Sequence, residues 1–247
     1  MSVQFPEPFV EPTPRRVRVR LGDALVADST RAQLLVQYGD AGLPTYYLPM
    51  SGVRPDALVD EAQDRGRRTW TVSVGGRQAV RAAWTHASPV GALAPLADHV
   101  TFSWRQLDWY EEDEQVVVHA RDPHKRVDTL RSSRRVQVYV GGEQLADSVR
   151  PLLLFETLLP TRYYLPFEDV RTDLLEASDT VTVCPYKGRA RYWSVRVKDT
   201  FVPDAAWSYP DPIAENPKIR DLLCFFNERV DLLVDGEQLP RPRTPWS

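Results

Sequence analysis

A short stretch that occurs twice decides the fold: Tyr163-Tyr164-Leu165-Pro166 repeats Tyr46-Tyr47-Leu48-Pro49, which stands 117 residues earlier. Further matches flank both copies in the same chain order. They are Val17-Arg18-Val19 with Val136-Gln137-Val138, Ala27-Asp28-Ser29 with Ala146-Asp147-Ser148, Trp70 with Trp193, Ala82-Ala83-Trp84 with Ala205-Ala206-Trp207, and Phe102 with Phe225. A series of matches at nearly constant spacing is the signature of an internal repeat. The sequence therefore predicts two homologous domains in tandem.

Within each repeat the local pattern is mostly typical of β-strands. Residues 17–21 and 136–140 alternate apolar and polar side chains, and each run ends at a pair of residues suited to a hairpin turn. Residues 192–197 alternate in the same way and are rich in β-branched and aromatic side chains. We therefore expect a mainly β protein made of two small antiparallel β-barrel or folded-sheet domains.

One short helix is expected in each repeat. Pro55 and Asp56 suit the first turn of a helix running from residue 54 to residue 64, and residues 169–177 are the shorter equivalent. The expected domain plan is an extended arm (1–14), a first repeat (15–120), an ordered charged connector (121–135), a second repeat (136–240) and a tail (241–247).

Composition limits the class of protein. Hydrophobic residues make up 43% of the 247 residues, which is enough for packed cores, and the formal net charge is −3. Such a balance gives no basic surface for nucleic acid or an anionic membrane. The start of the chain shows no signal-peptide pattern, and no segment of the sequence has an apolar run long enough to predict a membrane helix. With only two cysteines, Cys184 and Cys224, we expect a cytoplasmic protein with reduced thiols.

The sequence resembles the domain of unknown function 427 family in its two-copy form, which is typical of bacterial genomes rich in arginine. The residues that carry the resemblance are Ala146-Asp147-Ser148, Arg162-Tyr163-Tyr164-Leu165-Pro166, Cys184-Pro185-Tyr186-Lys187-Gly188, Ala206-Trp207, Tyr209-Pro210, Phe225-Phe226-Asn227-Glu228-Arg229-Val230-Asp231, Trp109-Tyr110-Glu111-Glu112-Asp113-Glu114 and residues 119–128. The resemblance implies a compact β-rich fold and no established activity. The family is sometimes labelled nucleotidyltransferase-like, but the chain has no Gly-rich phosphate loop and no close Asp pair for Mg²⁺.

The two repeats differ most at Cys184-Pro185-Tyr186-Lys187-Gly188. The spacing of matched residues grows by six between the shared proline and the shared tryptophan, and Cys184-Pro185-Tyr186 has no counterpart near Arg65-Gly66. A lysine three residues from a cysteine can lower the thiol pKa and create a reactive thiolate. The alternative is a buried structural thiol beside a solvated lysine. Cys184 and Lys187 are the first catalytic candidates, and a ligand-holding role for Lys187 is favoured over thiol chemistry.

Glu156 is the third catalytic candidate, because a carboxylate that ends the apolar run 152–155 requires a partner such as Arg162 or Lys187 if it is buried. Gln37 stands at the equivalent place in the first repeat. The alternative is a structural ion pair. The predicted ligand-binding residues are Arg162, Tyr163, Tyr186, Lys187 and Trp193.

Metal and cofactor sites are not predicted. The acidic run 111–114 with His119 and His124 permits a metal site, but such runs more often pair with arginines, and no Cys-x-x-Cys pair exists. Two functions stay open. The first is binding of a small molecule in a pocket of the second repeat, with or without enzymatic activity. The second is a non-enzymatic interaction or scaffold module.

Overall fold

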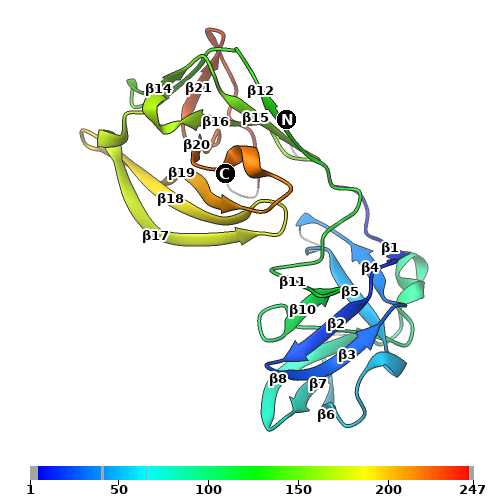
Figure 1. The fold of residues 1–247 in the computed structure, drawn as a ribbon. Helices are drawn as coiled ribbons and strands as arrows, with labels where there is room; N and C mark the ends of the chain where they lie inside the picture. The colour runs from blue at the N-terminus through cyan, green and yellow to red at the C-terminus, as the bar shows by residue number, and fades with distance from the viewer. Residues whose placement is uncertain (1–4, 40–41, 65, 245–247) are drawn as a thin grey trace. The chain divides into compact units, whose positions relative to one another are not determined.

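The computed structural model describes residues 5–39, 42–64 and 66–244. Residues 1–4 of the predicted arm, Arg65, and residues 245–247 of the predicted tail lie outside the described residues. The chain divides into two compact units, Phe5–Asp122 and the chain from Pro123 onward (Figure 1).

The first unit is built from two antiparallel sheets. A seven-stranded sheet has the order β1-β4-β5-β9-β8-β7-β6, and a four-stranded sheet has the order β11-β10-β2-β3. The strands are β1 (Phe9–Pro12), β2 (Val17–Leu21), β3 (Ala24–Ser29), β4 (Gln33–Val36), β5 (Thr45–Pro49), β6 (Leu58–Asp64), β7 (Arg67–Val74), β8 (Arg77–His86), β9 (His99–Phe102), β10 (Asp108–Glu111) and β11 (Glu114–Val116).

The second unit repeats this architecture. Its seven-stranded sheet has the order β12-β15-β16-β20-β19-β18-β17, and its four-stranded sheet has the order β14-β13-β21-β22. The strands are β12 (Val127–Arg131), β13 (Val136–Val140), β14 (Glu143–Ser148), β15 (Leu152–Glu156), β16 (Arg162–Pro166), β17 (Leu175–Cys184), β18 (Gly188–Val197), β19 (Thr200–Pro212), β20 (Leu222–Phe225), β21 (Asp231–Val234) and β22 (Glu237–Gln238).

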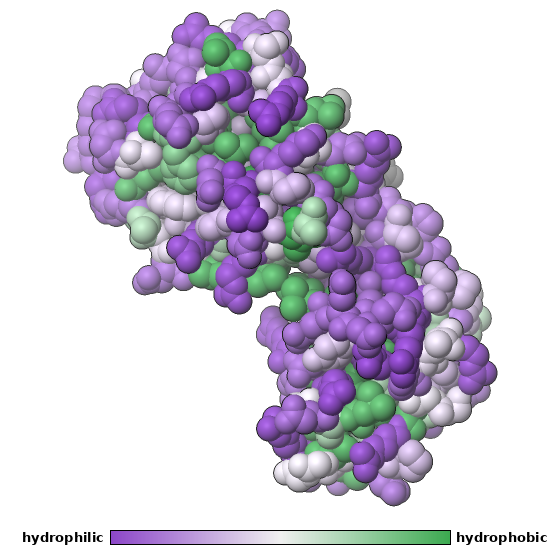
Figure 2. Space-filling view, viewed as in Figure 1, coloured by the Kyte–Doolittle hydropathy of each residue, from purple (hydrophilic) through white to green (hydrophobic). Residues whose placement is uncertain are grey.

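The prediction of two mainly β, antiparallel halves is confirmed, and the sheets stay open rather than closing into barrels. In each unit the main core lies between the two sheets, where alternate residues of strands such as β2 and β13 are fully buried. On the face shown in Figure 2 the surface is mostly hydrophilic, with hydrophobic residues in scattered patches. The duplicated sequence thus folds into a duplicated structure.

The two predicted helices are wrong. Residues 58–64 form β6, and Asp56 has a φ of 65°, a left-handed conformation that cannot begin a right-handed helix. In the second unit β17 already starts at Leu175. The described residues contain only short 3-10 segments: η2 (Met50–Gly52), η3 (Gly91–Leu96), η4 (Phe167–Asp169), η5 (Thr172–Leu174) and η6 (Pro217–Ile219). In the described part of the chain, no helix is long and apolar enough to cross a membrane.

Two edge strands lie in segments expected to be an arm and a connector. β1 pairs with β4 in the first unit, and β12 pairs with β15 in the second. The two pairings are equivalent. Phe9 pairs with Val36 in the first unit, and Asp128 pairs with Phe155 in the second, where both residue numbers are higher by 119. Each of these segments therefore extends the sheet of the repeat that follows it.

The seven-stranded sheet of the second unit buries residues on both faces. One face packs on the four-stranded sheet, and the other, called here the outer face, carries a second cluster. The buried members of that cluster are Leu152, Leu154, Tyr164, Ala190, Trp207, Tyr209, Ile219, Cys224 and Phe226. In the first unit the corresponding cluster is smaller and contains Leu35, Tyr47 and Leu96. Most of the sequence-predicted site residues gather on the outer face of the second unit.

Candidate functional site

The turn at residues 184–188 joins β17 to β18 and is fixed by the loop that follows β19. The Lys187 amide donates to the Cys184 carbonyl at 3.2 Å, and the Ile213 amide donates to the Lys187 carbonyl at 3.1 Å. The Asn216 side-chain amide donates to the Tyr186 carbonyl at 2.7 Å. Three hydrogen bonds therefore hold the turn in one conformation, with Tyr186 buried.

The length difference between the repeats is spread over three strands. β17, β18 and β19 contain 10, 10 and 13 residues, whereas β6, β7 and β8 contain 7, 8 and 10. In the second repeat the end of the hairpin is longer, and it carries Cys184, Tyr186 and Lys187 toward the last residue of β15. The additional residues of the second repeat therefore lengthen strands β17 to β19 as well as the turn between β17 and β18.

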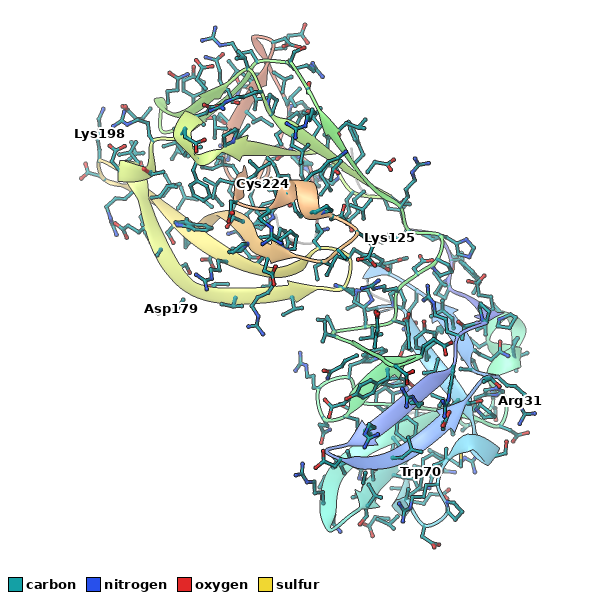
Figure 3. The ribbon with its side chains drawn as sticks, in the orientation of Figure 1. Arg31, Trp70, Lys125, Asp179, Lys198 and Cys224 are labelled. Atoms are coloured by element: carbon teal, nitrogen blue, oxygen red, sulfur yellow. The ribbon has the colours of Figure 1, made fainter. Side chains whose placement is uncertain are left out.

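Glu156 is the last residue of β15 and lies between two lysines. Its carboxylate forms an ion pair with Lys187 and a second with the Lys125 ammonium at 3.0 Å. The side chains of Glu156, Lys187 and Lys125 are only 5%, 11% and 12% exposed. The Lys125 ammonium also lies 5.4 Å from the centre of the Tyr186 ring, within the range of a cation–π interaction. Lys125 is labelled in Figure 3.

Each charged group in this cluster stabilises the ionised form of its partner. Burial alone would raise the pKa of Glu156, but Lys187 and then Lys125 more than offset it, so the pKa lies below its ordinary value. Burial alone would lower the pKa of Lys187, but the Glu156 carboxylate and then the Cys184 sulfur raise it above the ordinary value. Lys187 is therefore an ammonium at neutral pH. An ammonium can hold an anion, but it is not an amine nucleophile.

A second buried ion pair lies on the same outer face. The two terminal guanidinium nitrogens of Arg162 donate to the two carboxylate oxygens of Glu228, each at 2.7 Å. The Glu228 side chain is fully buried and that of Arg162 is 7% exposed. The guanidinium lies 5.4 Å from the ring centre of Trp207 and 5.7 Å from that of Phe226. A planar, two-pronged pair packed among aromatic rings has little freedom to move.

The remaining predicted ligand-binding residues lie on the other face of the sheet. Tyr163 belongs to the core between the sheets, and Trp193 packs against that core with its ring 5.6 Å from the ring of Phe167. Arg162, Tyr186, Lys187 and the catalytic candidates lie with the outer-face cluster instead. Because neighbouring strand residues face opposite sides, Tyr164 rather than Tyr163 accompanies Arg162.

The second cysteine is a buried member of the outer-face cluster. Cys224, labelled in Figure 3, is fully buried beneath this face, and burial raises the pKa of its thiol to about 12. Tyr164 accepts a hydrogen bond from the Trp207 indole at 3.1 Å, and burial raises its pKa well above the ordinary value. Both groups are neutral in the folded protein near pH 7.

With this geometry in place, comparison with known families is informative. The model described as Domain of unknown function (DUF427) matches residues 9–113 and again residues 128–236. The chain belongs to the DUF427 family. The two matches follow the internal repeat, so the protein carries two DUF427 copies in tandem. No curated protein matches the chain.

The first DUF427 repeat lacks both buried ion pairs. Gln37, Thr45 and Arg105 stand where the second repeat has Glu156, Arg162 and Glu228. In the first repeat Thr45 instead lies 3.3 Å from the Thr101 hydroxyl and accepts a hydrogen bond from the Trp104 indole at 2.8 Å. The DUF427 scaffold therefore folds with or without these charges.

Two site residues were missed in the sequence. Lys125 falls in the predicted connector, two residues before β12, and no pattern there indicated that it would lie beside Glu156. Glu228 lies within the DUF427-like stretch 225–231, and its sign of charge is opposite to that of Arg105 in the first repeat. A paired change, Thr45 to Arg162 and Arg105 to Glu228, was the available signal for a new ion pair.

The acidic run 111–114 lies in the first DUF427 repeat, among arginines of β2 and the segment before it. Glu111 accepts a hydrogen bond from the Tyr46 hydroxyl at 2.8 Å and forms an ion pair with Arg15 at 3.0 Å. Asp113 pairs with Arg18 at 2.6 Å. These contacts give the run a structural role at the edge of the four-stranded sheet.

Proposed function

We propose that the second DUF427 repeat binds a small anionic molecule at its outer face, beside the turn at residues 184–188. The observation that carries the proposal is the buried cluster of Glu156 with Lys187 and Lys125, built where the first repeat has an uncharged glutamine. In this proposal Arg162 and Tyr186 flank the ligand. Glu156, Lys187 and Cys184 are the residues available for any chemistry on it.

The cost of burial supports a functional reading of this cluster. Removing ions from water costs several kcal/mol each, and apolar residues of similar volume often stabilise a fold equally well. The first repeat keeps the same strand order without the cluster, so the architecture does not require it. Charged groups held at such a cost are frequent at binding and catalytic sites.

The protonation state of Lys187 favours an anion as the ligand. Because the pKa of Lys187 is raised, its side chain carries a full positive charge although only 11% of that side chain is exposed. A carboxylate or phosphate group entering there would compete with Glu156 for the ammonium, in a setting where charge–charge interactions are stronger than in water. Tyr186 offers an aromatic surface beside the same group.

A thermal-shift screen tests the proposal. We expect a carboxylate, phosphate or nucleotide to raise the melting temperature of the wild-type protein, since a ligand at a hundred times its Kd adds about 2.7 kcal/mol of stability. The shift should vanish in Lys187→Met and persist in Lys198→Met, which removes an exposed lysine at the β18–β19 turn of the same sheet.

Two outcomes would overturn the proposal. One is a complete panel of anions that leaves the wild-type melting temperature unchanged. The other is a ligand whose affinity for Lys187→Met equals that for wild type, measured by titration calorimetry at a temperature where circular dichroism shows both proteins folded.

A further inference from the structure

The free edge of the second seven-stranded sheet is formed by β17. This strand pairs with β18 on one side and ends the strand order of its unit on the other. An edge strand presents unpaired backbone N–H and C=O groups, and these can pair with another strand. The ten residues of β17 make it a long edge.

Natural edge strands are usually protected, and the first repeat follows that rule. Its edge strand β6 has the sequence Leu-Val-Asp-Glu-Ala-Gln-Asp, with three acids in seven residues. The distal part of β17, residues 180–184, reads Thr-Val-Thr-Val-Cys and carries no charge. Val181 is 48% exposed there, and Figure 2 shows hydrophobic residues along this margin of the unit. The distal edge of β17 in the second repeat therefore lacks the acidic side chains that protect the edge strand β6 in the first repeat.

The sequence of this edge is complementary to itself. We propose that two copies of the chain associate through antiparallel pairing of β17 with β17, on a two-fold axis at Thr182. In that register Val181 of one copy faces Val183 of the other, and Thr180 faces Cys184. Opposed residues of an antiparallel pair share a face of the sheet, so valine meets valine and threonine meets threonine. Such an interface is closed and uses the same surface on both copies.

Charge along the edge favours the same arrangement. The start of β17 is acidic, with Glu176 and Asp179 exposed, and Asp179 is labelled on this margin in Figure 3. The neighbouring strand carries exposed Arg191 opposite Val181 and exposed Arg189 opposite Val183. Antiparallel association brings the acidic start of each β17 toward the end of the other β17, next to which β18 carries Arg189 and Arg191. Complementary charge of this kind sets orientation and register.

A bulge limits the length of the pairing. The register between β17 and β18 shifts between Ala177 and Val181, so the uncharged part of the edge that follows the shift is residues 181–184, with Thr180 beside it. An interface of about five residues per copy is small, and we expect a dimer with a Kd on the order of 10 µM. The proposed dimer shares only Cys184 with the proposed anion site and does not rest on anion binding, so either proposal can fail without the other.

Sedimentation equilibrium of the full chain tests the dimer. We expect wild-type protein to change from dimer to monomer on dilution through the micromolar range. Val181→Lys places a charge in the centre of the edge and should raise the Kd at least about tenfold, or 1.4 kcal/mol. The matched control is Gln63→Lys on the exposed edge strand of the first repeat, which should leave the Kd unchanged. A wild-type chain that stays monomeric, or a dimer that Val181→Lys does not weaken, overturns the proposal.

Cross-linking tests the register and does not depend on the stability of the lysine variant. In a Cys184→Ser background, Thr182→Cys should form an intermolecular disulfide under mild oxidation, because the two introduced thiols face each other across the axis. Val80→Cys, at a 65% exposed position of β8, is the control for random collision. Cross-linking at position 182 no faster than at position 80 overturns the proposed register.

Discussion

Arg162 and Glu228 form a two-pronged ion pair, with both hydrogen bonds at 2.7 Å, beneath the outer face of the second repeat. Only the planar guanidinium can satisfy both carboxylate oxygens in this geometry. Thr244 also donates to Glu228 at 2.6 Å, which ties the end of the chain to the pair. The pair therefore links β16, the segment after β20 and the C-terminal residues.

Arg162→Lys should destabilise the second repeat even though it keeps the charge. The ammonium cannot reproduce the two parallel hydrogen bonds, so one oxygen of buried Glu228 loses its guanidinium donor, at a cost of about 2 kcal/mol. Urea denaturation followed by tryptophan fluorescence measures the change. Arg171→Lys, in the exposed pair with Asp173, is the control and should leave the midpoint unmoved. Equal effects at the two positions would contradict the structural assignment.

Glu156→Gln places the residue of the first repeat in the second. Lys187 and Lys125 then lose their shared counter-ion while still buried, and we expect a loss of about 3 kcal/mol in unfolding free energy. Glu176→Gln, in the exposed pair with Arg196, should produce no measurable shift in the denaturation midpoint. A Glu156→Gln protein as stable as wild type would show that the cluster is solvated in solution.

Acid should narrow the difference in unfolding free energy between wild type and Glu156→Gln. The pKa of Glu156 is lowered from its ordinary value of 4.5, so its contribution to stability is complete above that pH. The contribution is lost as the pH falls below 4.5 and through the lowered pKa of the folded state. The unfolding free energy of wild type should therefore fall more steeply than that of Glu156→Gln, by at most about 1.4 kcal/mol per pH unit. Parallel pH profiles below pH 4.5 would exclude a lowered pKa for Glu156.

The tandem, mainly β fold could be predicted because the two halves of the sequence can be aligned with each other. Matched strands such as residues 17–21 and 136–140 stand out when the halves are aligned, and each half supports the other. The helices predicted over 54–64 and 169–177 were wrong because Pro and Asp serve turns as well as helix starts. The edge strands β1 and β12 were missed because their segments are rich in proline or charge, and only pairing with β4 and β15 makes them strands.

The site was harder to predict for a different reason. The sequence indicated Glu156 and Lys187 through their difference from the first repeat, and the structure places them in one ion cluster. Which tyrosine of the pair 163–164 faces that cluster depends on strand register, and a shift of one residue exchanges the two faces. Lys125 and Glu156 are 31 residues apart in the chain, and a local sequence pattern cannot predict that they form an ion pair.

Gly188 tests how tightly the turn is held. Its φ is 108°, and an added Cβ would lie 3.0 Å from the Asp211 carbonyl oxygen and 3.3 Å from the Ile213 nitrogen. Gly142, in the β13–β14 turn, also has a positive φ, but an added Cβ there would meet nothing within 4 Å. We expect Gly142→Ala to cost about 1 kcal/mol and Gly188→Ala about 1–2 kcal/mol more, because backbone contacts are added to backbone strain. Equal denaturation midpoints for the two variants would contradict a tightly packed turn.

Thiol reactivity distinguishes the two cysteines in the native state. Cys224 is fully buried with a pKa raised to about 12, so at pH 8 only about one molecule in ten thousand carries its thiolate. Cys184 is partly exposed at the end of β17. We expect iodoacetamide at pH 8 to alkylate Cys184 and to leave Cys224 unmodified until urea unfolds the chain, as followed by peptide mass spectrometry. The Cys184→Ser protein should then take up no label while folded. Labelling of Cys224 in the native protein as fast as Cys184 would contradict the burial of the outer-face cluster, on which the proposed anion site depends.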